Sequence, residues 1–207
     1  MNAIPIRSLV YTALGSALFI VFSALQLKLA YSPVPITFQT LAIIFIGILL
    51  KPRAAFFSVA IVIILGLLGL PVFGGKSGLA HLLGPTGGFI IYFAFGAMLI
   101  SCAVSFIEAK FKANLLIKYA LYLFVFLLLS SWLAYVVGVP WFMISLGNTY
   151  TLTEAIALAC TPYLTGDVIK AVVGFLIFIA LHKQFMNIRN QQGRRASSSS
   201  ISFNHNG

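Results

Sequence analysis

The chain has 207 residues, of which 61% are hydrophobic and 8% are charged, and its mean hydropathy is +1.07. Soluble globular domains carry about 25% charged residues, so this composition excludes an ordinary soluble domain and indicates a membrane protein. The formal net charge of +10 would suit a nucleic-acid-binding protein. However, no aromatic residues interleave the basic ones as a nucleic-acid groove requires, and we exclude that class.

Six apolar segments follow one another along the chain, each near the length that crosses a bilayer as a helix, although the second and the last are short or tilted. Only helices and closed barrels satisfy the backbone in lipid, and apolar runs this long and uniform favour helices. The sequence therefore predicts an all-α integral membrane protein with six transmembrane helices. The predicted spans cover residues 8–27, 38–50, 54–70, 87–107, 115–137 and 166–181.

The basic residues fall unequally on the two sides of these spans. If the N-terminus lies inside, ten of the 13 Lys and Arg residues are on the inner side, and Lys28, Lys76 and Lys170 are on the outer side. The positive-inside rule then predicts a multi-pass protein whose N- and C-termini are both cytoplasmic. The positive charge is thus explained by topology, with a further attraction to anionic membrane lipid.

The predicted outer connections are long and rich in Gly and Pro, whereas the inner ones are short. The outer loops cover residues 28–37, 71–86 and 138–165. Such loops are more often lids or binding loops than connectors, so we expect the functional site to face outward. After a membrane domain of residues 1–183, residues 184–207 are polar, basic and serine-rich, and they are predicted to be a disordered cytoplasmic tail.

The last predicted span contains an ionisable pair. Asp167 and Lys170 are three residues apart and therefore share one face of a helix. Charged residues at membrane depth are costly and usually face a cavity, which makes the pair a candidate ligand site. The alternative is a local ion pair near the start of a helix, which the helix dipole favours without any ligand.

Two short patterns elsewhere in the chain are weaker indications of function than the pair of Asp167 and Lys170. Ala13 and Ala17 place small residues on one face of the first helix, which fits a partner interface and packing within the chain equally well. Residues 75–78 match a Gly-x-Ser-Gly protease pattern, but Ser77 lacks a histidine with an orienting acid. The three histidines and three acids are scattered and form no metal-ligand cluster. We therefore expect neither an enzyme nor a metal site.

Three motifs together carry a family resemblance. They are GLPVF at residues 69–73, LLGPTGGF at residues 82–89 and PYLTGDVIK at residues 162–170. In their order and spacing they resemble the BioY family, the biotin-specific S (substrate-capture) components of bacterial energy-coupling factor transporters. The resemblance extends from about residue 7 to residue 181. It departs from the family at Tyr163, where we expect Phe, and in the serine-rich tail.

The resemblance implies a six-helix bundle in the bacterial plasma (inner) membrane that binds biotin at its outer face, with no catalytic activity and no cofactor. It also implies a transmembrane coupling protein and two cytoplasmic ATPases as partners, which would hydrolyse the ATP because this chain has no Walker A motif. It assigns ligand contact to Asp167 and Lys170. It assigns docking of the coupling protein to Ala13 and Ala17.

The residues around the pair suit such a ligand. Lys170 can neutralise a carboxylate and Asp167 can accept N–H bonds from a ureido ring, although the reverse arrangement through water stays open. Weaker candidates are polar residues at the start of the second span, glycines that permit close approach, and aromatic residues that form apolar walls. These candidates are Gln39, Thr37, Gly87, Gly88, Phe73, Tyr92 and Tyr163.

Two other functions remain open at this point. One is an S component for another small anionic vitamin. The other is a structural membrane protein in which the pair of Asp167 and Lys170 only fixes packing. A proton-coupled carrier is disfavoured, because a lone acid leaves no relay of titratable groups.

Overall fold

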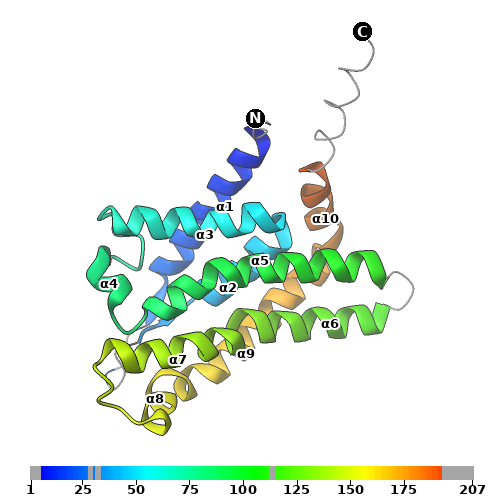
Figure 1. Ribbon diagram of the computed structural model, residues 1–207. Helices are drawn as coiled ribbons and strands as arrows, with labels where there is room; N and C mark the ends of the chain where they lie inside the picture. Colours follow the sequence, from blue (N-terminus) through cyan, green and yellow to red (C-terminus); the bar gives the residue numbers. More distant parts are fainter. Residues whose placement is uncertain (1–5, 28–29, 31–33, 112–114, 193–207) are drawn as a thin grey trace, which may run out of the picture.

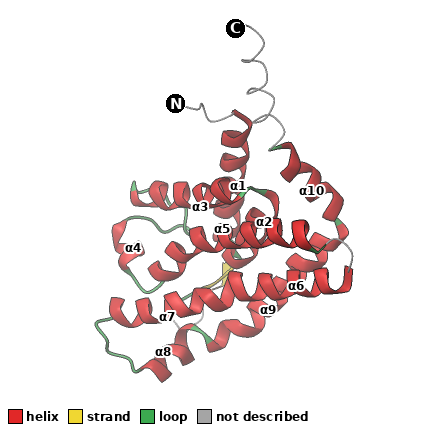
Figure 2. Cartoon of the chain, turned by 45° about the vertical axis from the view of Figure 1, so that its right-hand side comes forward, coloured by secondary structure: helices red, strands yellow, loops and turns green. Residues whose placement is uncertain are grey.

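The computed structural model describes residues 6–27, 30, 34–111 and 115–192. These residues are almost entirely helical, and the short strands form one antiparallel hairpin (Figure 2). In chain order the elements are α1 (Ile6–Ala24), β1 (Gln26–Leu27), β2 (Ile36–Thr37), α2 (Gln39–Leu49), α3 (Pro52–Leu67), α4 (Leu79–Leu83), α5 (Gly87–Lys110), α6 (Leu115–Leu127), the π-helical segment η1 (Leu128–Trp132), α7 (Leu133–Ser145), α8 (Leu152–Ala159), α9 (Thr161–Ala180) and α10 (His182–Gln191).

The predicted helical membrane protein is confirmed, since each predicted span coincides with a helix over most of its length. The helices α1, α5 and α9 are long and apolar enough to cross a membrane, as is the continuous helix Leu115–Ser145 formed by α6, η1 and α7. The apolar helices α2 and α3 are shorter, at 11 and 16 residues. The count of six spans and the side on which the termini lie stay predictions.

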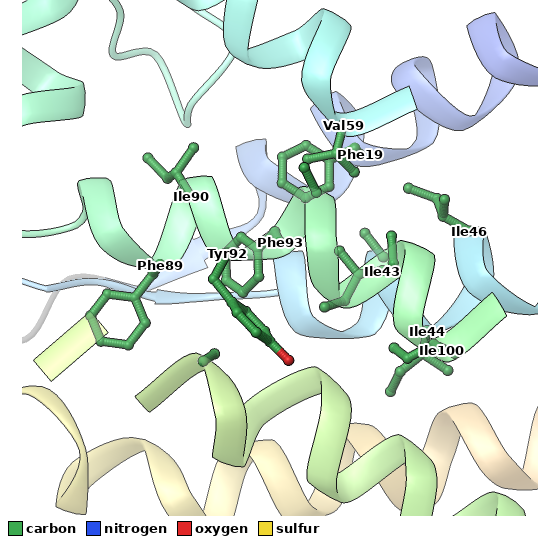
Figure 3. Close-up of a cluster of buried hydrophobic side chains, with 14 of the residues drawn as sticks. Phe19, Ile43, Ile44, Ile46, Val59, Phe89, Ile90, Tyr92, Phe93 and Ile100 are labelled. Carbon is green, nitrogen blue, oxygen red and sulfur yellow. The ribbon is translucent and has the colours of Figure 1, made fainter. Parts of the chain in front are cut away.

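The central helix of the bundle is α5, which packs against α2, α3 and α7 (Figure 1). Helix α2 is buried around most of its circumference, as expected of a helix that is apolar on all sides. The buried side chains meet in one core, where the rings of Phe19 and Phe93 lie 6.1 Å apart beside Ile43 and Val59 (Figure 3). This core holds α1, α2, α3 and α5 in fixed relative positions.

The predicted outer loop at residues 138–165 is largely helical, so that prediction is wrong. Helix α7 continues through Gly138 and Pro140, and α8 occupies much of the remainder. Pro and Gly are tolerated inside membrane helices because neighbouring groups satisfy the backbone that they free. The start of α8 is fixed by a capping box between Thr151 and Glu154.

Helix α10 lies at the opposite end of the bundle from α4 and α8 (Figure 1). It falls partly within the tail predicted to be disordered at residues 184–207, and buried Arg189 explains the difference. The Arg189 guanidinium donates to the carbonyl oxygens of Leu50, at the end of α2, at 2.5 Å and of Ser101 at 2.7 Å. A cation at a helix C-terminus satisfies carbonyls that have no helical partner. Residues 193–207 of the predicted tail lie outside the described residues.

Candidate ligand-binding site

A cavity lies at the end of the bundle that carries α4 and α8, on the left in Figure 1. Helices α2, α5, α7 and α9 contribute to its walls, together with the β1–β2 hairpin and the loop between α3 and α4. Polar, charged, aromatic and aliphatic side chains all line it. They are Ser23, Gln26, Val34, Pro35, Thr37, Gln39, Thr40, Phe73, Lys76, His81, Thr86, Phe89, Ile90, Phe93, Tyr135, Ala159, Tyr163, Asp167 and Lys170.

Asp167 and Lys170 form a buried ion pair at this cavity. Lys170 Nζ lies 2.5 Å from Asp167 Oδ1, and the two residues are 8% and 6% exposed. Lys170 also donates to the carbonyl oxygen of Thr37 at 2.7 Å. The carboxylate of Asp167 accepts from Thr40 Oγ1 at 3.3 Å and from the Tyr135 hydroxyl at 2.5 Å. Burying two ions is unfavourable, and these hydrogen bonds offset part of that penalty.

A chain of hydrogen bonds extends from Thr37 along the start of α2 to α1. Thr37 Oγ1 donates to Gln39 Oε1 at 3.0 Å, and Gln39 Nε2 donates to Ser23 Oγ at 2.9 Å. Gln39 and Ser23 are both buried. Because these groups hold one another in place, this wall of the cavity is a preorganised polar surface.

The loop between α3 and α4 contributes a tight turn. The backbone groups of Phe73 and Lys76 exchange two hydrogen bonds of 3.1 Å, and Gly74 and Gly75 between them have φ values of 59° and 83°. Two consecutive positive φ values are required by a type I′ turn and favour Gly at both positions. Gln26 Nε2 donates to the Gly74 carbonyl oxygen at 2.7 Å, which ties this turn to β1.

Two further lining residues lie in α4 and at the start of α5. The ring of His81 packs against Phe73, with centroids 5.6 Å apart. Burial and the charge of Lys76 lower the pKa of His81 from its ordinary value of 6.5, so the ring is neutral at pH 7. The hydroxyl oxygen of Thr86 is buried and has no hydrogen-bond partner within the described residues. Buried polar atoms are nearly always satisfied, so this oxygen is available to a bound molecule.

The family model for BioY matches residues 1–187 of the chain. This chain belongs to the BioY family. It is 34% identical to the biotin transporter BioY2 of Lactococcus lactis subsp. cremoris (strain MG1363), over 87% of this chain and 93% of that protein. It is 32% identical to the biotin transporter BioY of Rhizobium etli, over 83% of this chain and 90% of that protein.

A solved structure gives the same assignment. The crystal structure of the S-component for biotin from an ECF-type ABC transporter resembles this chain with a TM-score of 0.75 and 29% identity. The match covers 88% of this chain and 94% of that one. The family assignment, this structural match and the long apolar helices together show that this BioY chain is a multi-pass plasma-membrane protein.

Most of the predicted site residues of the BioY chain line the cavity, namely Thr37, Gln39, Phe73, Tyr163, Asp167 and Lys170. Gly87, Gly88 and Tyr92 are not among the lining residues. A Cβ on Gly87 would come to 1.6 Å from the Leu82 carbonyl oxygen of α4 and 2.9 Å from Trp141 Nε1 of α7, and a Cβ on Gly88 would come to 2.4 Å from Trp141 Cβ. The hydroxyl of Tyr92 points away from α5 (Figure 3) and donates to the Leu129 carbonyl oxygen at 2.7 Å. These residues serve the packing of α5 against the helix formed by α6, η1 and α7, and Gly87 also permits the close approach of α4.

Sequence reasoning missed several polar lining residues. Thr40 and Tyr135 matter most, since both bond to Asp167. Thr40 directly follows the predicted site residue Gln39 at the start of an apolar helix. A second polar residue at that position could have been predicted to belong to the site. Tyr135 lies in a different predicted span, and no local pattern connects it with Asp167. Gln26 was missed because the first span was predicted to continue to residue 27, whereas α1 ends at Ala24 and Gln26 lies in β1. Lys76 was missed because its position depends on how the loop between α3 and α4 folds.

Ala13 and Ala17 are exposed and are not among the cavity-lining residues; on α1 they precede the lining residue Ser23. The neighbouring face of α1, which carries Gly15 and Ser16, packs against α3 inside the bundle. Ser16 Oγ donates to the Ser58 carbonyl oxygen of α3 at 2.7 Å, and a Cβ on Gly15 would come to 2.5 Å from Ser58 Oγ. Small residues therefore bring α1 close to α3, while the Ala13 and Ala17 face stays uncovered by the described residues.

Proposed function

We propose that this chain is the S component of an energy-coupling factor transporter, which binds biotin with high affinity and takes it up across the plasma membrane. One observation carries the proposal. The fold matches a solved S-component for biotin over 94% of that chain, and a cavity with apolar walls and a few polar and charged side chains lies at one end of this fold.

The chemistry of the cavity suits biotin. Biotin combines a neutral ureido ring, which has two N–H donors and a carbonyl acceptor, with an aliphatic tail that ends in a carboxylate. Oxygens of Asp167 and Gln39 can accept from ring N–H groups, and the Thr86 hydroxyl can donate to the ring carbonyl. Phe73 and Tyr163 add aromatic surface, so the cavity has the usual composition of apolar walls with a few placed polar groups.

The proposed partners are a transmembrane coupling protein and two cytoplasmic ATPases of an energy-coupling module. Residues Ala13 and Ala17 form the proposed docking face for the coupling protein, because small exposed residues permit close helix approach. We assign the chain no catalytic step and no cofactor, since biotin is the transported ligand and the partners hydrolyse ATP. The inner excess of basic residues supports cytoplasmic N- and C-termini.

The test is equilibrium binding of labelled biotin to the purified full chain in detergent. We expect saturable binding that unlabelled biotin displaces and that lipoate and pantothenate do not. Preference for one of these other anions would favour the related vitamin transporter. A chain that unfolds cooperatively on heating but binds none of the three would favour a structural role and overturn the proposal.

A further inference from the structure

The charged groups around the cavity are unevenly distributed. Asp167 and Lys170 are buried, and their opposite charges cancel. Lys76 is exposed, and within the described residues its ammonium group has no ion-pair or hydrogen-bond partner. His81 beside it adds no charge at pH 7. The described lining residues therefore carry one uncompensated positive charge, and it lies at the exposed side of the cavity.

The turn that carries Lys76 fixes the direction of its side chain. Phe73 and Lys76 are directly paired in an antiparallel bridge, so their side chains project from the same face of the pair. Phe73 is 4% exposed and lines the cavity. Gly66 of α3 leaves room for its ring, since a Cβ there would come to 2.2 Å from Phe73 Cε2. The anchored Phe73 thus directs Lys76 to the cavity with less ordering on binding than a free loop lysine would need.

Lys170 is less suited to a ligand carboxylate. Its ammonium group already contacts Asp167 at 2.5 Å and the Thr37 carbonyl oxygen at 2.7 Å. A ligand carboxylate at this position would have to share the ammonium group with Asp167, which would place two anions together in a buried site. Like charges repel strongly where water is excluded. A neutral ring meets no such penalty.

We propose that Lys76 recognises the carboxylate of the ligand, while Asp167 and Lys170 face its neutral ring. This inference rests on the proposed function, because it takes biotin as the ligand. It places the ring at the buried side of the cavity and the tail at the exposed side. The charge of Lys76 also attracts the anion as it enters, an effect that added salt screens.

The experiment compares the affinities of biotin and biotin methyl ester for wild type, Lys76→Ala, Lys76→Arg and Lys170→Ala. Lys76→Ala should weaken biotin binding by roughly three- to tenfold and leave the affinity for the uncharged ester unchanged. Lys76→Arg should keep the preference for biotin over the ester. Lys170→Ala should weaken both ligands to the same extent. Lys110→Ala is the matched control, because this exposed lysine lies at the opposite end of α5 from the cavity.

A preference for biotin that survives in Lys76→Ala would overturn the inference, as would equal affinities of wild type for biotin and the ester. Loss of the preference in Lys170→Ala alone would place the carboxylate on Lys170. The Lys76 variants decide the question even where Lys170→Ala fails to fold, because Lys76 is exposed and lacks partners among the described residues. Failure of the proposed function gives a different result, since wild type would then bind neither ligand.

Discussion

The ion pair of Asp167 and Lys170 is held by bonds to Thr37, Thr40 and Tyr135 without any ligand. A purely structural pair would need the same bonds, so the pair by itself does not distinguish a ligand site from a packing device. The cavity beside it is a feature that a packing device does not need. Stability and ligand affinity must therefore be measured separately on the same variants.

Removing one member of the pair, in Asp167→Asn or Lys170→Met, leaves the other charge without its partner. We expect the free energy of unfolding of the ligand-free protein to fall by about 3–5 kcal/mol. The double variant has no stranded charge, so its melting temperature should return toward wild type, while its biotin affinity stays low because the carboxylate acceptor is gone. Thermal unfolding and biotin binding of the three variants check this. Wild-type affinity in the double variant would show that the pair is structural only.

Thr86→Val removes a buried hydroxyl that has no partner within the described residues. We expect the melting temperature of the ligand-free protein to stay the same or rise, because no internal hydrogen bond is lost. Biotin affinity should fall by roughly tenfold if the hydroxyl bonds to the ligand. Thr40→Val is the matched control, since its hydroxyl bonds to Asp167 and its loss should lower both quantities. An unchanged affinity in Thr86→Val would remove Thr86 from the site.

Among the helices, the length of the apolar runs predicted where the spans lie but not where they end. Gly138 and Pro140 carry the local signal of a helix end, yet α7 continues through both because a membrane bundle tolerates them. The π-helical η1 rotates the residues after it relative to an α-helix, so helical periodicity could not show which face carries Tyr135. Asp167 and Lys170 were predictable as a pair because one helix carries both.

Arg189 shows how tertiary contacts can order a polar segment that composition alone makes look disordered. The residue is 6% exposed, and burial lowers its pKa to about 10, which leaves it charged at neutral pH. Its partners are carbonyl oxygens at the end of α2 and in α5, together with two serine hydroxyls of α5. These partners are far from residue 189 in the sequence, so no local pattern predicts them.

Arg189→Gln should therefore undock α10. We expect the free energy of unfolding to fall by about 2 kcal/mol, a value within the range typical of hydrogen bonds to a charged group. Proteolysis within α10 should become faster. Arg53→Gln removes the same charge from an exposed arginine at the start of α3 and should change neither quantity. Melting temperatures and limited proteolysis of the two variants test this. Equal protection of α10 in both would mean that other contacts hold it.

The cavity, α10 and the exposed face of α1 occupy three different parts of the molecule. The cavity lies at the end with α4 and α8, and α10 lies at the other (Figure 1). Helix α1 has one face packed on α3 and another face that exposes Ala13 and Ala17. This arrangement leaves a partner free to bind α1 without covering the cavity, which is what an S component that captures its ligand before transport requires.

The docking proposal predicts that binding and transport can be separated by substitutions on α1. Ala13→Leu or Ala17→Leu should leave biotin binding by the purified chain unchanged, but should abolish ATP-driven uptake in cells that contain the coupling module, because bulky side chains prevent close helix approach. Ala157→Leu introduces the same bulk at an exposed position of α8 and should preserve both activities. Gly15→Ala should behave differently and lower the melting temperature, since its Cβ would meet Ser58 and Leu50 inside the bundle. Joint loss of binding and uptake in Ala13→Leu would mean that Ala13 supports the fold, and the docking face would then have to be sought on another helix.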